Sequence, residues 1–159
     1  MSHPDWLPEL VRLEDRGGDW QRYVDEIYRC FLRRFVDSHP HLDGKPVTLK
    51  AGAPLAGKHY TFWHLISEGP QEDEKVPDLR RCERILWPRA MIEAADSARI
   101  VRWRTRARGR PRVVLALPDF SYIVVLSEHP SYYVLWTAYP VERNHRRRKL
   151  QAEYKQNAG

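Results

Sequence analysis

Two apolar runs near the C-terminal end of the chain form the clearest pattern of hydrophobic and polar positions. Residues 123–126 (IVVL) and 132–136 (YYVLW) are β-branched or aromatic almost throughout, and the polar turn cluster 128–131 (EHPS) separates them. Such runs on either side of a turn are typical of a β-hairpin, and their composition favours the middle of a sheet. We therefore predict two neighbouring antiparallel strands here.

Two further strands are predicted before this hairpin. Residues 99–105 alternate between two sets of side chains, residues 113–117 are continuously apolar, and Gly109 lies in the turn between them. Four consecutive short strands with tight connections predict an antiparallel meander. An additional short strand is predicted at residues 47–50.

The first half of the chain has helical periodicity instead. Asp19 is a candidate N-cap before an apolar stripe that runs from Trp20 to Phe35 at three- and four-residue spacing. Asp78 begins a second helical pattern, and Pro88 suits the first turn of a helix that reaches Ala95. The expected fold is α+β, with N-terminal helices packed on a C-terminal four-stranded antiparallel sheet and a basic C-terminal helix. We expect an N-terminal arm at residues 1–17 and one domain at 18–159.

The segments between these elements contain one ambiguous stretch. Residues 60–67 are rich in aromatic side chains, and as a strand this segment would present Tyr60, Phe62, His64 and Ile66 on one face. The loop before it has the glycine spacing of a phosphate-binding loop, but His59 stands where the magnesium-binding hydroxyl belongs. Residues 70–77 are predicted to form a polar, acidic loop.

Charge narrows the choice of partners. The 159 residues carry a formal net charge of +6, and arginines concentrate at residues 99–112 and 143–149. Arginine binds phosphate through its bidentate fork, so this distribution favours a polyanion such as nucleic acid. No apolar run approaches the length of a membrane span, and no signal peptide is apparent, so no membrane partner and a cytoplasmic location are expected. Cys30 and Cys82 are expected to be buried free thiols.

The candidate chemistry is that of metal-independent RNA cleavage. The sequence has no HExxH, GxSxG or Cys/His cluster, and we expect no metal and no cofactor. Transphosphorylation of RNA needs a proton-transfer residue together with cations or hydroxyls for the phosphorane charge. His64 can transfer protons, while Thr137 and Tyr139 follow a buried strand. The candidate phosphate-binding residues are Lys58, Arg84, Arg102, Arg104, Arg146, Arg147 and Lys149.

The residues FWHL, RRCERILWPRAMIE, YIVVL and YYVLWTAYPVERNHRRRK resemble phage-type nuclease domains of the barnase–EndoU–colicin–RelE (BECR) superfamily. The resemblance covers roughly residues 45–155 and implies a metal-independent ribonuclease of toxin or phage-effector type. The central histidine of the family would be His64, and the hydroxyl of the terminal strand would be Thr137, with Tyr139 beside it. The basic residue near the sheet would be Arg84, Arg102 or Arg104. RNA, including transfer RNA, and an acidic inhibitor or immunity protein are the implied partners.

Two other functions remain open from the sequence. A non-catalytic RNA- or DNA-binding module would use the basic helix at residues 143–149 and aromatic side chains on a sheet face, such as Trp103, Tyr132 and Tyr133. An interaction protein would instead pair its arginines with an acidic partner protein. Substitution of His64 would abolish turnover only in the enzyme.

Overall fold

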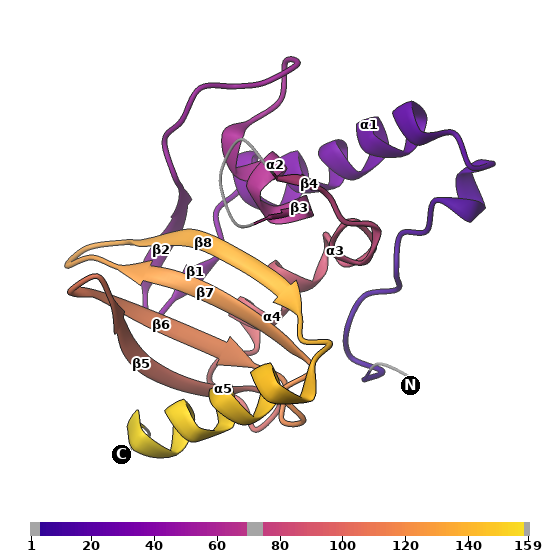
Figure 1. Ribbon diagram of the computed structural model, residues 1–159. Coiled ribbons are helices and arrows are strands. Elements are labelled where there is room, and N and C mark those ends of the chain that lie inside the picture. The colour runs from indigo at the N-terminus through magenta and orange to yellow at the C-terminus, as the bar shows by residue number, and fades with distance from the viewer. Residues whose placement is uncertain (1–3, 70–74, 158–159) are drawn as a thin grey trace.

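The computed structural model describes residues 4–69 and 75–157, which form an α+β fold (Figure 1). The helices are η1 (Glu14–Arg16), α1 (Trp20–Phe31), its π-helical continuation η2 (Leu32–Val36), α2 (Tyr60–Ile66), α3 (Leu79–Glu83), α4 (Trp87–Glu93) and α5 (Asn144–Asn157). The strands are β1 (His41–Leu42), β2 (Lys45–Leu49), β3 (Ser67–Glu68), β4 (Val76–Pro77), β5 (Val101–Ala107), β6 (Arg110–Ala116), β7 (Tyr122–Glu128) and β8 (Tyr133–Pro140).

The main sheet has six strands in the order β1-β2-β8-β7-β6-β5, so the prediction of a four-stranded antiparallel sheet is wrong. Strands β5 to β8 form the predicted antiparallel meander. Strand β2, however, pairs in parallel with β8, with Val47 opposite Tyr133, and β1 pairs with β2. The sheet is therefore mixed, and β3 and β4 form a separate two-stranded sheet.

The parallel pairing of β2 with β8 explains why helices separate β2 from strands β5 to β8 in the sequence. Parallel strands need a long crossover connection, and here α2, α3 and α4 form part of it. Strand β2 is short, and its partner lies more than 80 residues away in the sequence. Local periodicity predicts such a strand but holds no signal for which strand it will join.

The segment at residues 60–67, which the sequence left ambiguous and which could have formed a strand, is mostly the helix α2. Its buried side chains are Thr61, Phe62, Leu65 and Ile66, which recur at the three- and four-residue spacing of one helix face. The segment is so short that its side chains fit the two-residue period of a strand as well as the period of a helix. Most of the predicted acidic loop at residues 70–77 lies outside the described residues, and its end is the short strand β4.

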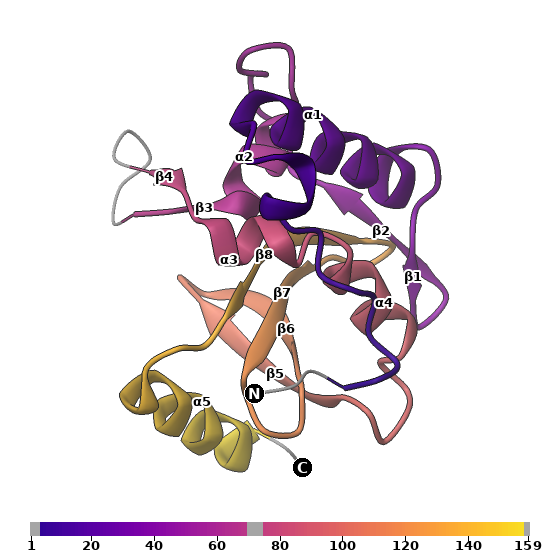
Figure 2. The ribbon, with the colours of Figure 1, turned by 90° about the vertical axis from the view of Figure 1, so that its right-hand side faces the viewer.

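The sheet separates two hydrophobic clusters. The larger cluster joins the side of the sheet that carries Leu115 and Leu126 to helices α1, α2, α3 and α4. The smaller cluster joins the opposite side, including Trp103 and Val114, to Leu150 of α5. Figure 2 shows α5 on one side of the sheet and α1 and α4 on the other. We call the side with Trp103 and Val114 the α5 face.

Local signals at the helix ends are confirmed. The Asp19 carboxylate accepts a hydrogen bond from the Arg22 amide at 3.2 Å, and Asp78 caps α3 in the same way through the Arg80 amide at 3.1 Å. Pro88 lies in the first turn of α4. Cys30 and Cys82 are both buried free cysteines.

The segment predicted as an N-terminal arm packs on the helical side of the fold. Val11 is buried, its amide donates to the Glu83 carbonyl at 2.9 Å, and its carbonyl accepts from the Tyr23 hydroxyl at 2.6 Å. The Trp87 indole donates to the Pro8 carbonyl at 2.9 Å. Buried backbone groups of this segment therefore find partners in α1, α3 and α4.

Candidate functional site: an indole between two cations

The site begins at an irregularity in β8. The pairing of β7 with β8 shifts between Val125 and Leu126, because Val125 lies opposite Thr137 while Leu126 lies opposite Leu135. Trp136 is the extra residue of this β-bulge. Bulges turn a side chain away from the regular alternation and are frequent next to functional sites. The indole of Trp136 is thereby placed where side chains from several strands can reach it.

Two cations contact the Trp136 indole. The Arg112 guanidinium carbon lies 4.1 Å from the ring centroid, and Nζ of Lys50 lies 4.0 Å from it. Arg112 belongs to β6 and lies on the α5 face, since it pairs with Ser127 and precedes Val114 by two residues. Lys50 follows directly after β2. We call Lys50, Arg112 and Trp136 the Trp136 site.

The charge of Arg112 is not balanced by a carboxylate within the described part of the chain. No ion pair involves it there, and its Nε is buried without a hydrogen-bond partner among the same residues. Burial, together with the neighbouring Arg110 and Arg108 guanidiniums, lowers the pKa of Arg112 from its ordinary value. A cation in this situation gains from an arriving anion, because a charge-assisted hydrogen bond would satisfy its donors.

His64 adjoins the Trp136 site. The parallel pairing with β2 ends where Leu49 faces Leu135, and beyond that point α2 packs along β8. This packing brings the His64 ring to 6.4 Å from Trp136, centroid to centroid, at an interplanar angle of 71°. Nδ1 of His64 lies 2.7 Å from Nζ of Lys75. An ammonium group only donates, so Nδ1 accepts and the proton of the neutral ring resides on Nε2.

Thr137 and Tyr139 lie on the α5 face, the face that holds Arg112. Thr137 pairs with Val125, and Tyr139 pairs with Ile123. Thr137 directly follows Trp136 and is half-buried. The hydroxyl of Tyr139 accepts a hydrogen bond from Nη2 of Arg146 at 2.8 Å, so Tyr139 joins the sheet to α5. The structure thus brings His64 and Thr137 to Trp136, and Tyr139 and Arg146 together further along β8.

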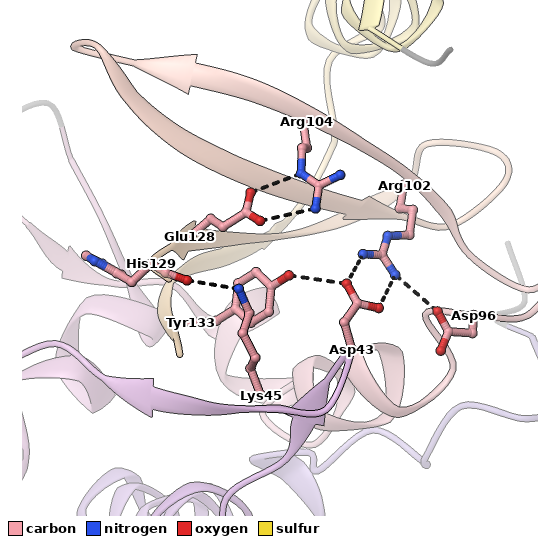
Figure 3. A network of polar contacts seen from close by, with 8 residues as sticks. All are labelled: Asp43, Lys45, Asp96, Arg102, Arg104, Glu128, His129 and Tyr133. Atoms are coloured by element: carbon pink, nitrogen blue, oxygen red, sulfur yellow. Dashed lines mark hydrogen bonds and ion pairs between the residues drawn. The ribbon is translucent and has the colours of Figure 1, made fainter. Parts of the chain in front are cut away.

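The predicted phosphate-binding residues Arg102 and Arg104 lie on the opposite face. Arg102 pairs with Leu115 and Arg104 with Val113, both in the larger hydrophobic cluster. Figure 3 shows both guanidiniums in an ion-pair network. The Arg102 guanidinium binds Asp43 at 2.7 Å and Asp96 at 3.1 Å.

Arg104 forms a bidentate pair with Glu128, at 3.0 and 3.1 Å. In the same network the hydroxyl of Tyr133 donates to Asp43 at 3.2 Å, and Lys45 donates to the His129 carbonyl at 2.9 Å. Hydrogen bonds to these carboxylates raise the pKa of Arg102 and of Arg104, the reverse of the direction at Arg112. These two arginines stabilise the fold, where they tie the turn between β1 and β2, and strand β7, to β5.

The other predicted cations are dispersed. Nζ of Lys58 pairs with Asp25 of α1 at 3.0 Å. Arg84 stacks on Trp87, with 5.1 Å from guanidinium carbon to ring centroid, and lies 3.7 Å from Glu83. Arg84 and Arg147 line a separate cavity of about 240 Å³ that neither His64 nor Thr137 lines. Lys149 is exposed on α5.

A second cavity adjoins His64. It measures about 480 Å³ and is lined mainly by the apolar and aromatic side chains of Leu55, Tyr60, Trp63 and His64, with Lys75 contributing a charge. Sequence reasoning missed this cavity, and it also missed Lys50, Arg112 and Trp136 as site residues. The signal at Arg112 was its place on the strand face that continues with the apolar residues Val114 and Ala116, where a charged side chain needs an explanation.

Comparisons with protein-family models, with curated proteins and with solved structures each return no match. The resemblance to BECR nucleases therefore remains an expectation. Among the described residues, no group of three His, Cys, Asp or Glu side chains is arranged to hold a metal ion. None of the helices in the described ranges combines the length and the apolar character that crossing a membrane requires.

Proposed function

We propose that this protein binds RNA on the α5 face of the sheet and cleaves it without a metal ion. The observation that carries the proposal is the Trp136 site, where an arginine without a carboxylate partner among the described residues stacks on an indole next to a histidine. Arginine and lysine are the side chains that bind phosphate, and an indole offers a surface on which bases stack. We expect the protein to act in the cytoplasm.

In this proposal the Trp136 site holds the scissile phosphate. The RNA 2′-oxygen attacks phosphorus and loses its proton, the bond to the 5′-oxygen breaks, and that oxygen gains a proton. The products are a 2′,3′-cyclic phosphate and a 5′-hydroxyl. Arg112 and Lys50 stabilise the additional negative charge of the phosphorane, and the Thr137 hydroxyl, on the same face as Arg112, is the proposed further hydrogen-bond donor.

His64 is the proposed proton-transfer residue. Its Nδ1 accepts from Lys75, so Nε2 carries the ring proton and donates it to the leaving 5′-oxygen while Nδ1 takes a proton from the Lys75 ammonium. The proton of the 2′-hydroxyl passes to water in the same reaction. Imidazole exchanges protons readily near neutral pH, which suits it to this transfer. Tyr139 and Arg146, joined by their hydrogen bond, lie further along the same strand and suit the RNA backbone beyond the scissile phosphate.

A second candidate function is RNA binding without cleavage. The bond from Lys75 to His64 favours it, because this bond occupies one imidazole nitrogen and fixes the ring as a hydrogen-bond donor rather than a base. The same phosphate contacts would then serve binding alone. An acidic inhibitor protein would compete with RNA for the same cations under either function.

The test is incubation of the purified protein with total RNA and with transfer RNA in EDTA, together with His64→Gln and Arg112→Gln. We expect the wild-type protein to leave 2′,3′-cyclic phosphate ends and both variants to lose at least about 100-fold in rate. Arg104→Gln is the matched control, since it removes one arginine from the opposite face. Salt-sensitive binding without cleavage in all four proteins would replace the enzyme with the binding module.

A further inference from the structure

The cavity beside His64 has the size and walls of a site for a planar ring. Its volume of about 480 Å³ falls within the range of about 300–1,000 Å³ that is typical of small-molecule sites. Tyr60 and His64 stack nearly parallel, with 6.1 Å between ring centroids and an interplanar angle of 13°. Trp63 is held in place because its indole nitrogen donates to the Leu55 carbonyl at 2.8 Å. The walls are therefore aromatic and partly fixed before any ligand arrives.

The cavity is connected to the Trp136 site through Lys50. Nζ of Lys50 lies 4.0 Å from the Trp136 ring centroid and 5.7 Å from the centroid of Tyr60, which lines the cavity. His64 also belongs to both places, since it lines the cavity and contacts Trp136. A phosphate at Arg112 and Lys50 would thus lie next to the mouth of an aromatic cavity. A nucleotide likewise carries an aromatic base beside its phosphate, so one nucleotide could occupy both places.

We propose that the cavity takes an unpaired nucleobase whose own or adjacent phosphate is bound by Arg112 and Lys50. The proposal builds on the proposed function and defines its substrate class as single-stranded RNA, or the loops of folded RNA. A base can enter only after it has left its stack and its pairing partner. A rigid A-form duplex holds its bases inside, so it would offer phosphates to the Trp136 site and leave the cavity empty.

Aromatic walls also predict the kind of specificity. Stacking accepts every base because each has a π-face, whereas sequence-specific recognition needs hydrogen bonds to base edges. The described lining offers few polar groups, namely Ser67 and Lys75 besides His64. We therefore infer a strong preference for unpaired over paired RNA and a weak preference among the four bases.

The experiment uses a short 2′-O-methyl oligoribonucleotide with 2-aminopurine at its centre, since the missing 2′-hydroxyl prevents cleavage. Its binding is measured alone and after annealing to its complement. Trp63→Ala removes one wall, and Ala53→Trp fills the cavity from an exposed lining position, where no packing is lost. Trp20→Ala is the control, because Trp20 is an exposed tryptophan of α1 that does not line the cavity.

We expect the wild-type protein to quench 2-aminopurine and to bind the single strand at least about tenfold more tightly than the duplex. Both cavity variants should lose the quenching and roughly 5- to 100-fold in single-strand affinity, with unchanged duplex affinity, whereas Trp20→Ala should behave as wild type. Equal binding of both RNAs, weakened by Arg112→Gln but not by the cavity variants, would overturn the inference and leave the proposed function standing. No salt-sensitive binding of either RNA would overturn both.

Discussion

Replacement of Arg112 by glutamine tests whether this arginine binds an anionic ligand or instead stabilises the fold. In the wild-type protein the guanidinium stacks on Trp136, has no carboxylate partner among the described residues, and has a pKa lowered by burial and by its arginine neighbours. Glutamine keeps a polar side chain of similar reach but removes the charge. The substitution therefore tests whether this charge is held for an anion.

The expected effect on the fold is small. A cation–π contact contributes about 0.5–1 kcal/mol at an exposed site and more when it is desolvated. Removal of a partly buried charge that has no anionic partner offsets part of that loss. We expect the free energy of unfolding to change by less than about 1 kcal/mol, measured by urea denaturation with tryptophan fluorescence.

The expected effect on RNA is large. A hydrogen bond to a charged group contributes about 1.5–3 kcal/mol, which corresponds to a loss of roughly 10- to 150-fold in affinity. Loss of one phosphate contact should also lower the slope of log K against log salt by about 0.7 for a single strand. Fluorescence anisotropy of a labelled 2′-O-methyl RNA at several salt concentrations measures both quantities.

Arg104→Gln provides the comparison. Arg104 forms a bidentate pair with Glu128, and its side chain is 65% exposed, so its removal should cost about 1 kcal/mol or less in stability and little in RNA affinity. The reasoning would be refuted if both variants lost RNA affinity equally. It would also be refuted if Arg112→Gln left RNA binding intact, or if it lowered the free energy of unfolding by more than about 2 kcal/mol.

Three further predictions concern the fold. Hydrogen bonding from Arg102 lowers the pKa of Asp43, so the Asp43 carboxylate should contribute stability above its ordinary pKa of about 3.9 and lose it as pH falls through the lowered value. Asp43→Asn should therefore lower the free energy of unfolding by about 1 kcal/mol at pH 7 and leave it unchanged near pH 2. An equal loss at both pH values, measured from urea midpoints, would contradict this. Leu150 is the buried residue of α5, so Leu150→Ala should accelerate amide hydrogen exchange across α5 while β7 stays protected; unchanged exchange would show that other contacts hold the helix. Leu135→Ala, at a fully buried position of β8, should lower the free energy of unfolding by about 2–5 kcal/mol, whereas Leu55→Ala, at a side chain that is 65% exposed, should change it by less than about 0.5 kcal/mol in the same denaturation assay.

The ion-pair network of Figure 3 explains why arginine content was a poor guide to the site. Arg102, Arg104 and Arg112 lie within one hairpin, and composition treats them alike. In the fold the two arginines of β5 face the side where Asp43 and Glu128 arrive from distant parts of the chain. Arg112 lies on the other side, where Glu153 of α5 accepts from the Trp103 indole and no described carboxylate pairs with Arg112. A guanidinium that already pairs with a carboxylate of the protein gains little from binding the phosphate of a ligand.

The sequence by itself determined the features that depend on near neighbours. The caps at Asp19 and Asp78, Pro88 in the first turn of α4, the meander from β5 to β8 and the basic C-terminal helix all follow from local spacing and residue type. His64 and Thr137 were also identified as candidates from the sequence, and the fold places both beside Trp136. The caps, the first turn of α4, the meander and the C-terminal helix each depend on interactions within a few residues or on the two-residue period of a strand.

Only the tertiary structure decided the rest. It paired β2 in parallel with β8, made a helix of residues 60–66, and placed Lys50 and Arg112 on one indole. Each of these features depends on a partner far away in the sequence, and no local pattern specifies such a partner. A seven-residue aromatic segment satisfies both a helical and a strand pattern, so the surface that it can bury decides between them. The identity of the arginine that remains for a ligand likewise depends on where every carboxylate lies in the folded chain.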